Sequence, residues 1–450
     1  MVGLLRRSHI VGVLCFVAGC GGAGAGDSQT TDASDAESTA TMNSGGSEAS
    51  STGAMDTSEA GDTSDGSDAT DTSTTTDGSE TTGGPEPMGW LPVVGSNASA
   101  IPDSTDVAIA PDGTIYVSWV QNQANNDAYV ARSLDGGMTW SSPSVVDDQG
   151  LQPRAGSGRQ PYLAVTDEDV YIVYDVADVA AGIFMHRSAA ADAMDFSDIT
   201  TLVSPGTSTD YAHIDISASG ELWAAWQQYE GDPAQGRIVF SRESNGFAIE
   251  EVSASTPGIP CECCRLDLRF NSGGDAILAY RNNVGDLRNM WALRAASGTS
   301  SFAGAVEASH TDWMSFVCPM EGPSLADDGA RQYIAWADSS SGEWRAYVGT
   351  SDDAGQSWGD AVLLAPNQNG LQGSPVVAVG DSGTVYAVMD VGGSMSVFVT
   401  SDDQGASWSE PVELANDSGN ILNPRVRSEN MVTGAVGVAQ DGSVWFYRFE

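Results

Sequence analysis

The sequence predicts an all-β fold in which seven similar units of about four strands each form a β-propeller. The first observation is an octad of the form S-x-D-x-G-x-[ST]-W, which occurs at 133–140, 351–358 and 401–408. The second is a spacing of about 50 residues between aromatic residues that begin short strand-like runs. The third is that runs such as TIYVSWV and TVYAVM lie between Gly- and Asp-rich turns, with no convincing long amphipathic helix.

The octad is suited to a tight turn that ends on a buried aromatic ring. Its aspartate accepts hydrogen bonds from nearby backbone N–H groups, and its glycine adopts a positive φ without steric cost. The tryptophan then packs its large apolar face into the body of the protein. The predicted structural positions are Ser133, Asp135, Gly137, Trp140, Ser351, Asp353, Gly355, Trp358, Ser401, Asp403, Gly405 and Trp408.

Aromatic residues mark a repeat of 50-odd residues. Trp358 and Trp408 are 50 residues apart, and Trp140 precedes Trp358 by 218 residues, which fits about four repeats. The weaker anchors between them are Phe196, Phe247 and Phe302, and Trp90 begins a seventh run, WLPVVG. A second series of strands ends in Trp119, Tyr174, Trp226, Tyr280, Trp336 and Met389.

Seven anchors predict seven blades, with six blades as the alternative. The last segment, from about Asn423, holds only two clear strands, TGAVGVA and SVWFYRF. We expect the N-terminal run WLPVVG to join them and seal the ring, because closure removes open sheet edges.

The three octads resemble the Asp-box, or BNR, repeats of sialidase-like β-propellers. In that family the box is a structural hairpin between the third and fourth strands of a blade, away from the active site, and sialidases have six blades. The resemblance implies a fold more firmly than an activity. If the protein is an enzyme, the resemblance implies a glycoside hydrolase of the exo-sialidase type.

The chain departs from the catalytic pattern of that family. Sialidase-like enzymes hold the carboxylate of sialic acid with three arginines, use a Tyr/Glu pair as nucleophile and base, and use an aspartate as acid/base. The family's F-R-I-P motif has its nearest match in Ser99-Ala100-Ile101-Pro102, where alanine replaces the arginine. No Tyr/Glu pair can be carried over.

Residues 1–20 are predicted to be a lipoprotein signal peptide. Arg6 and Arg7 precede an apolar run, 10–18, that is too short to span a bilayer. The segment ends in VAGC, which resembles a bacterial lipobox and implies that Cys20 is lipidated; an ordinary signal peptide is the alternative. Gly21 follows the cysteine, so we expect anchoring to the cell envelope at the outer membrane or cell surface.

Residues 21–86 are predicted to be a disordered tether rich in Ser, Thr, Gly and Asp. They contain fourteen acidic residues and no Lys, Arg or aromatic residue, so they cannot bury enough apolar surface to fold. The folded propeller is assigned to residues 87–450 and is expected to be a monomer. The formal net charge of −43 disfavours binding to nucleic acids, which are polyanions.

The most unusual chemistry in the sequence is a group of cysteines. Cys261, Cys263, Cys264 and Cys318 are predicted to form two disulfides, because the protein is expected to be exported and their number is even. Three pairings stay open. The alternative is a soft-metal site, such as one for Cu(I), with thiolates and either Met320 or His310 as ligands. The motifs C-x-C-C, Y-R, R-x-M and C-P-M also resemble a subset of sialidase-like bacterial proteins to which no activity is attached.

Arginines near a propeller mouth are suited to binding an anion, because a planar guanidinium pairs with a carboxylate through two hydrogen bonds. The leading candidates are Arg281 and Arg288, followed by Arg159 and Arg265, while Glu321 is a candidate acid near the channel. The alternative for each arginine is a structural salt bridge.

We predict a binding propeller that recognises a glycan or a protein through its mouth. The alternatives are an exo-glycosidase of the sialidase type and a copper-handling envelope protein. Calcium binding by the many carboxylates is a weaker possibility, since no EF-hand loop is present. No cofactor and no metal site are assigned.

Overall fold

The computed structural model describes residues 89–449 except 96–98, 123–124, 147–149, 177–180, 190–193, 231–235, 254–255 and 318. The predicted signal peptide with Cys20, the predicted tether and Cys318 lie outside the described residues. No helix of the described part is both long enough and apolar enough to cross a membrane.

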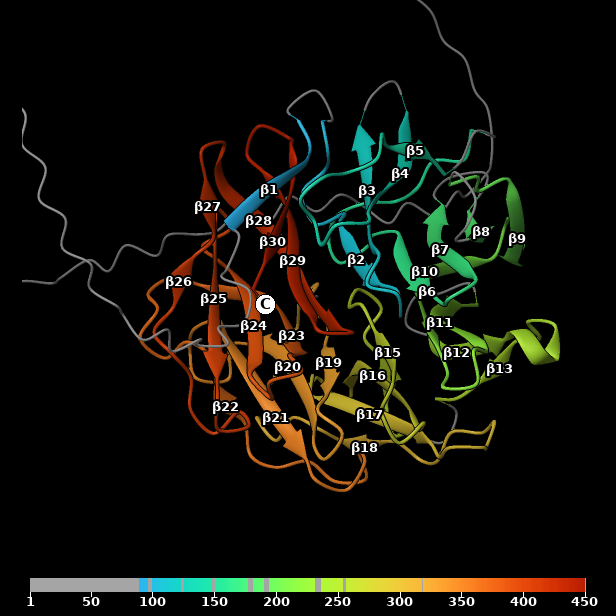
Figure 1. Ribbon diagram of the computed structural model, residues 1–450. Helices are drawn as coiled ribbons and strands as arrows, with labels where there is room; N and C mark the ends of the chain where they lie inside the picture. The colour runs from blue at the N-terminus through green and yellow to red at the C-terminus, as the bar shows by residue number, and fades with distance from the viewer. Residues whose placement is uncertain are drawn as a thin grey trace, which may run out of the picture. The chain divides into compact units, whose positions relative to one another are not determined.

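The described residues form seven antiparallel blades that follow one another around a ring (Figure 1). Seven blades were predicted, so this expectation is confirmed and the six-bladed alternative is wrong.

Each of the first three blades is a four-stranded sheet whose strands pair in chain order. Blade 1 comprises β2 (Asp106–Ile109), β3 (Ile115–Asn122), β4 (Asn126–Ser133) and β5 (Ser144–Val145). Blade 2 comprises β6 (Tyr162–Val165), β7 (Asp169–Val176), β8 (Gly182–Ala189) and β9 (Asp198–Val203). Blade 3 comprises β10 (Ser208–Ile216), β11 (Leu222–Tyr229), β12 (Arg237–Arg242) and β13 (Glu250–Glu251), with the 3-10 turn η4 (Glu243–Asn245) after β12.

The next three blades repeat this order, and blade 4 carries an extra short strand, β14 (Ile259–Pro260), which pairs with β16. The regular strands of blade 4 are β15 (Asp267–Phe270), β16 (Ala276–Asn283), β17 (Met290–Ala295) and β18 (Val306–Glu307). Blade 5 comprises β19 (Ser324–Asp327), β20 (Gln332–Asp338), β21 (Arg345–Ser351) and β22 (Val362–Leu363). Blade 6 comprises β23 (Gln372–Val379), β24 (Val385–Val391), β25 (Met395–Ser401) and β26 (Val412–Glu413).

The two ends of the folded part meet in blade 7. Its strands are β28 (Gly419–Glu429), β29 (Val432–Ala439), β30 (Val444–Arg448) and β1 (Gly89–Val94), with a short β27 (Ala415–Asn416) beside β28. β1 pairs with β30, placing Trp90 opposite Tyr447, so the blue strand lies against the red ones (Figure 1). The predicted closure is therefore confirmed. Blade 7 also contains the inner strand β28, which the sequence did not predict, because only two C-terminal strands were expected here.

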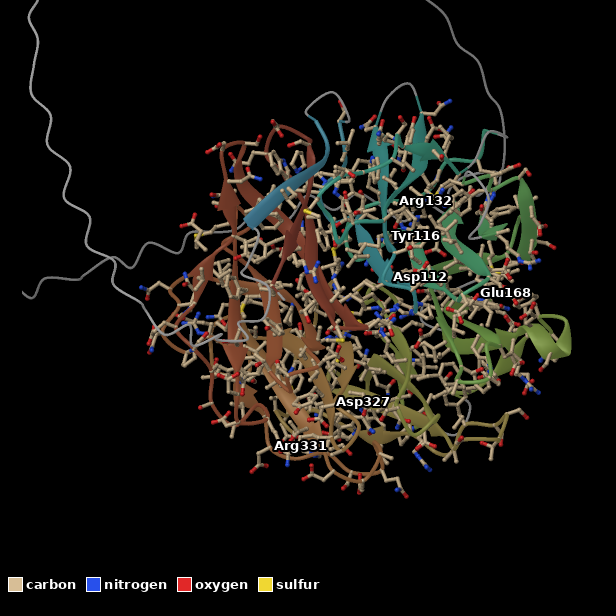
Figure 2. All side chains as sticks on the ribbon, viewed as in Figure 1. Asp112, Tyr116, Arg132, Glu168, Asp327 and Arg331 are labelled. Carbon is tan, nitrogen blue, oxygen red and sulfur yellow. The ribbon has the colours of Figure 1, made fainter. Side chains whose placement is uncertain are left out.

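Apolar side chains pack between neighbouring blades rather than in one central core. Seven buried clusters occur among the described residues, one for each pair of adjacent blades, and side chains fill the space between the sheets (Figure 2). The cluster that joins blades 7 and 1 contains Val436, Phe446 and Trp119. The predicted strand-end aromatics lie on second strands and are almost fully buried: Trp119, Tyr174, Trp226, Tyr280 and Trp336, with Met389 in the same position.

Each octad forms the turn between the third and fourth strands of its blade, that is, between β4 and β5, β21 and β22, and β25 and β26. In the last octad the Ser401 hydroxyl accepts a hydrogen bond from the Gly405 N–H at 2.9 Å and donates to Asp403 at 2.8 Å. Asp403 also accepts from the N–H of Ser407 at 2.8 Å. The other two octads make the same bonds. Hydrogen bonds from Ser407 lower the pKa of Asp403 to about 2.

Carboxylates of the inner strands connect one blade to the next around the channel. Asp106 accepts a hydrogen bond from the N–H of Leu163 at 2.9 Å, and Asp267 accepts from the N–H of Leu325 at 2.7 Å. These bonds satisfy backbone donors that face the channel, where a strand has no neighbouring strand. The channel is therefore lined by charged groups that already serve the fold.

Candidate ligand-binding mouth

One end of the channel is formed by the beginnings of the inner strands and the segments before them. Among the described residues, six of the seven blades have a residue other than glycine with a φ between 46° and 59° here, either before the inner strand or at a β-bulge within it: Asp103, Ser157, Tyr211, Met320, Ser374 and Asn423. Such conformations are uncommon for these residue types and gather at functional sites. The equivalent turns give this end, here called the mouth, a shape that strand pairing alone would not produce.

A cavity of about 380 Å³ opens at the mouth among blades 1, 2, 5, 6 and 7. It is lined by three carboxyl groups, those of Asp103, Glu321 and Asp390. Trp344 contributes a half-buried aromatic ring, and Leu371 is 54% exposed. A few convergent polar groups beside apolar and aromatic surface are typical of a small-ligand site of this size.

Glu321 is held at the mouth by blade 6. Its carboxylate accepts hydrogen bonds from the N–H of Ser374 at 2.9 Å and from the Ser374 hydroxyl at 3.1 Å. Burial raises the pKa of Glu321, and the nearby guanidinium of Arg265 acts against this rise. The predicted placement of Glu321 near the channel thus agrees with its position in the structure.

Asp390 lies at the end of β24 and faces the same cavity. It accepts hydrogen bonds from the Ser396 hydroxyl at 2.7 Å and from the N–H of Asn423 at 2.9 Å. Burial raises its pKa to about 6, and the carboxylates of Asp103 and Glu321 add to the rise. The three acids therefore act on one another electrostatically across the cavity.

Two other cavities differ from the mouth cavity in their lining. One of about 190 Å³ opens at the opposite end of the channel, where Arg269 and Asp215 belong to the inner-strand network. One of about 600 Å³ lies between turns of blades 3 and 4 and is lined mainly by Ser, Ala and Gly. The first cavity brings Phe270 together with the carboxyl groups of Asp215, Asp327 and Glu429, but the guanidinium groups of Arg269 and Arg427 balance part of their charge. The second has a single carboxyl group, that of Glu221.

Arg281 and Arg288, the leading predicted ligand-binding residues, serve the fold, so this assignment is corrected. The Arg281 side chain is fully buried and donates to the carbonyl oxygens of Glu321 at 3.0 Å, Arg288 at 2.6 Å and Ala337 at 2.7 Å. Arg288 is 6% exposed and donates to the carbonyl of Ser315 and to the sulfur of Cys261. Neither guanidinium is placed to meet a ligand.

The two remaining predicted arginines are also engaged. Arg159 donates to both carboxylate oxygens of Asp210 at 2.6 Å and lies 4.5 Å from the centre of the Tyr211 ring. Arg265 donates to the carbonyls of Pro323 and Pro375 and lines a void of about 20 Å³ inside the channel, room for about one water molecule. A carboxylate ligand would have to displace existing partners from both.

The cysteines differ from the expected two disulfides. Cys263 is disulfide-bonded, whereas Cys261 and Cys264 are free and buried. The prediction that all of these side chains are oxidised is therefore wrong for Cys261 and Cys264 in this structure. A turn of only two residues holds their sulfurs 3.1 Å apart as a hydrogen-bonded pair.

Sequence reasoning missed four mouth and channel residues, namely Asp103, Trp344, Asp390 and Arg425. Arg425 follows a β-bulge in β28, the strand that was not expected. The other three lie outside the octads and carry no local motif. The one signal in the sequence for a role outside the repeat was Trp344, because it belongs to neither of the two aromatic series.

Comparisons with known proteins give a fold likeness only. No protein-family model and no curated protein matches the chain. Among solved structures, it is similar to the NanB sialidase of Streptococcus pneumoniae, with 11% identity, a TM-score of 0.44, and coverage of 79% of this chain and 69% of that one. The α-L-arabinofuranosidase Arb93A of Fusarium graminearum shows 13% identity and a TM-score of 0.45 over 81% and 98% of the two chains. The polysaccharide lyase Uly1 shows 9% identity and a TM-score of 0.49 over 77% and 89%.

Proposed function

We propose that this protein is an exported, lipid-anchored propeller that binds a hydroxyl-rich glycan in the mouth cavity around Glu321. The observation that carries the proposal is the convergence of Asp103, Glu321 and Asp390 with Trp344 around one cavity of about 380 Å³. Anchoring rests on the sequence, in which the lipobox-like VAGC segment ends at Cys20 and the acidic stretch 21–86 would act as a spacer.

The lining has the groups that a sugar ring requires. Ionised carboxylates accept hydrogen bonds from sugar hydroxyls, and each carboxylate has lone pairs for more than one donor. An aromatic ring such as that of Trp344 packs against the apolar C–H face of a sugar. Glu321 and Asp390 also favour a neutral or cationic glycan over an anionic one, because like charges repel across a partly desolvated cavity, whereas the charge of Asp103 is balanced by Arg425.

Binding of a panel of neutral, amino and acidic glycans would test this function. The protein would carry Cys20→Ser, so that it is exported without a lipid. Glu321→Gln and Trp344→Ala should each weaken binding of the best glycan at least about tenfold, a loss of roughly 1.4 kcal/mol. Glu413→Gln, on the exposed edge strand β26, is the matched control and should change nothing. Failure of every glycan, or equal losses in all three variants, would contradict the proposal.

A second candidate is an exo-glycosidase, favoured by one observation. The carboxyl groups of Asp390 and Glu321 face the same cavity, burial raises the pKa of both, to about 6 for Asp390, and a glycosidase typically uses a pair of carboxyl groups. The sialidase type has less support, since Arg159, Arg265, Arg281 and Arg288 all have partners. Turnover of fluorogenic glycosides that Asp390→Asn abolishes would favour this candidate; sialoside turnover would restore the sialidase type.

A copper-handling role is the third candidate and has the least support. The sulfurs of Cys261, Cys263 and Cys264 lie within 4.8 Å of one another, but Cys263 is disulfide-bonded. Metal analysis of protein purified from the cell envelope, with a count of free thiols, would test this role. Stoichiometric copper bound to free thiols would support it.

A further inference from the structure

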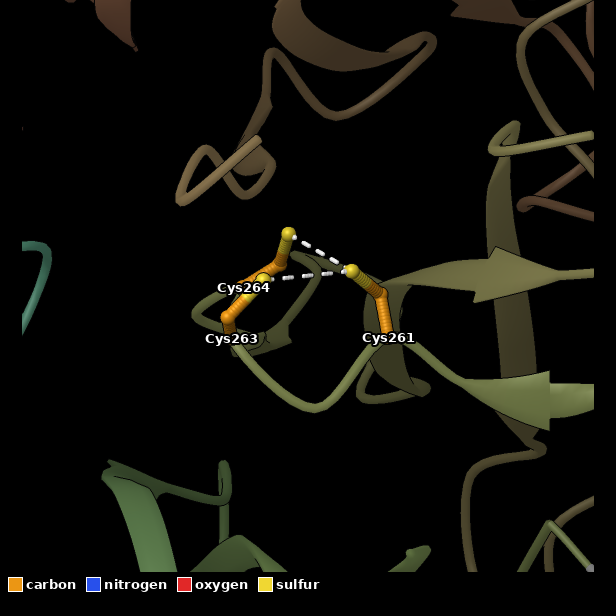
Figure 3. Close-up of side chains that lie close together, drawn as sticks. All are labelled: Cys261, Cys263 and Cys264. Atoms are coloured by element: carbon orange, nitrogen blue, oxygen red, sulfur yellow. Dashed lines mark hydrogen bonds between the residues drawn. The ribbon is translucent and has the colours of Figure 1, made fainter. Parts of the chain in front are cut away.

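Three sulfur atoms gather in the short loop between β14 and β15 (Figure 3). The Sγ atom of Cys261 is 3.1 Å from that of Cys264 and 3.6 Å from that of Cys263. Cys261 and Cys264 are fully buried free thiols, whereas Cys263 is partly exposed and disulfide-bonded. A free sulfur thus touches both a second free sulfur and one sulfur of a disulfide.

Side chains of blade 3 fix this loop. Gln227 donates from Nε2 to the carbonyls of Cys261 at 3.0 Å and Cys264 at 2.7 Å. The hydroxyl of Tyr211 donates to the carbonyl of Cys263 at 2.8 Å. Because the carbonyl group of each cysteine is held by a side chain of blade 3, the three sulfurs stay within reach of one another.

The surroundings favour a thiolate at Cys261. Arg288 donates from Nη1 to the Cys261 sulfur at 3.0 Å. The hydrogen bond from Cys264, followed by the charges of Arg288 and Arg281, lowers the pKa of Cys261 to about 7. Burial raises the pKa of Cys264, which keeps its proton and donates it to the Cys261 sulfur. Only the thiolate is the nucleophile in thiol–disulfide chemistry, so Cys261 is the prepared member of the pair.

The separation of the free sulfurs disfavours a metal between them. Two thiolates on one metal ion at ~2.3 Å each lie roughly 3.7–4.6 Å apart, depending on the angle at the metal. The observed 3.1 Å is shorter than this range. A thiolate 3.6 Å from a disulfide sulfur is placed to attack that disulfide.

We propose that Cys261 is the internal nucleophile of a thiol–disulfide exchange that moves the disulfide of Cys263 inward. In the first step the Cys261 thiolate attacks the Sγ atom of Cys263, the Cys261–Cys263 bond forms, and the former partner of Cys263 leaves as a thiolate. Cys264 gives its proton to that leaving thiolate and then attacks the Sγ atom of Cys261. The Cys261–Cys264 disulfide forms and Cys263 leaves as a thiolate, so one disulfide replaces another with no net oxidation.

The product differs from the starting state in what it exposes. The new disulfide is buried, while Cys263, which is partly exposed, becomes a free thiol. The exchange thus converts an inert loop into a thiol that can form a mixed disulfide with another molecule carrying a thiol or disulfide. Arg288 is a positioning residue in this scheme, because it acts through Cys261.

The test is disulfide mapping of the native full chain after timed incubation. Protein purified without reductant would be held at pH 5.5 or pH 8, quenched in acid, unfolded, alkylated and digested for mass spectrometry. We expect the Cys261–Cys264 disulfide and alkylated Cys263 to accumulate, more than about tenfold faster at pH 8, because the thiolate fraction of Cys261 rises across this range. A disulfide at Cys263 that persists unchanged at pH 8, or a Cys261–Cys264 disulfide already present beside it, would overturn the proposal.

Two variants separate the exchange from a structural role. Cys264→Ser should stop the reaction at the Cys261–Cys263 disulfide, a species that the wild type does not accumulate. Arg288→Gln should move the pH midpoint of the rate upward, whereas Arg331→Gln, far from the loop at the exposed ion pair with Asp352, should leave it unchanged. An unshifted midpoint in folded Arg288→Gln protein would remove the role of Arg288, and absence of the trapped disulfide in Cys264→Ser would refute the reaction order.

Discussion

The guanidinium of Arg425 donates a hydrogen bond to the carboxylate of Asp103 at 2.7 Å, although the two residues are 322 positions apart in the chain. Asp103 leads into blade 1 and Arg425 belongs to the inner strand of blade 7, so the pair joins the two ends of the ring at the mouth. Both side chains are at most 10% exposed. Asp103 also accepts from the N–H of Gly158, which extends the connection into blade 2.

Removing the charge of Asp103 should destabilise the propeller strongly. In Asp103→Asn the buried Arg425 loses its counter-charge, and breaking a buried pair from one side costs about 3–5 kcal/mol. Asparagine tolerates the positive φ of this position, which limits backbone effects. The free energy of unfolding from urea titrations is the measurement. Asp352→Asn, which removes the partner of Arg331 in an exposed pair (Arg331 is labelled in Figure 2), should cost less than about 1 kcal/mol. Equal losses would show that Asp103 and Arg425 contribute no more than a surface pair.

The octad serine should matter more than its exposed neighbours. Ser401 is 2% exposed, and Ser401→Ala would leave the Gly405 N–H without its acceptor, at a cost of about 1–3 kcal/mol. Ser409→Ala is the control, because the Ser409 hydroxyl is exposed and water can replace it. Thermal and urea unfolding of the two variants would measure the difference. A Ser401→Ala protein as stable as the control would mean that water reaches the turn.

Asp175 should make stability depend on pH in the neutral range. Burial and the nearby carboxylate of Asp210 raise its pKa from 3.8 to about 7, and one of its oxygens has no hydrogen-bond partner. Because the folded-state pKa is the higher one, its contribution is present in full below about pH 4 and is lost as the pH rises through about 7.

Asp175→Asn should therefore be more stable than the wild type at pH 8, by about 2–4 kcal/mol, and close to it at pH 4. Urea titrations at both pH values would give the two differences. Asp360 is exposed, so Asp360→Asn serves as the control and should change the free energy of unfolding by the same small amount at pH 8 and at pH 4. A variant that is destabilised at pH 8 would show that the ionised carboxylate of Asp175 is a favourable partner in the fold.

Arg281 should behave as a structural residue. The planar guanidinium of Arg281 donates to three carbonyl oxygens that lie in different directions, and the single ammonium group of lysine cannot reach all three. Arg281→Lys should therefore lower the free energy of unfolding by about 3 kcal/mol relative to the wild type. The contact of the guanidinium with the Trp313 ring, at 4.9 Å from its centre, would be weakened as well. Arg331→Lys is the matched control, with an expected loss under about 1 kcal/mol. Below the unfolding temperature, Arg281→Lys should keep the glycan affinity of the wild type; a selective loss of affinity would restore Arg281 as a ligand-binding residue.

The parts of the fold that recur locally could be predicted from the sequence. The octad occurs in three blades, and a buried aromatic residue lies on the second strand of the first five blades. Each copy of a repeated feature strengthens the prediction made from the others. Seven blades and the seal made by β1 followed from that repetition. The inner strand β28 was not expected, because its sequence GNILNPRVRSE mixes polar residues and a proline with few apolar ones.

The site was harder to predict, because its residues are defined by partners from distant segments. Nothing near Arg281 in the chain indicates that the carbonyls of Glu321 and Ala337 surround its guanidinium. Asp103 and Asp390 look like ordinary turn and strand-end acids until blades 1 and 6 are placed around one cavity. Glu321 lines the mouth cavity, but the sequence offered it only as one of many acids, and its role as a ligand-binding residue stays a prediction.

The seal of blade 7 has a consequence for how this protein is made. β1 is synthesised first among the folded segments, and its partner β30 is synthesised last. A ribosome or an export channel that releases the chain from its N-terminus must therefore deliver almost every blade before the first strand finds its neighbour. Throughout that interval β1 has no partner strand, and the last blade of the nascent protein is incomplete. Late biosynthesis, before β30 is made, is therefore the stage at which the edge of β1 is exposed to association with other chains.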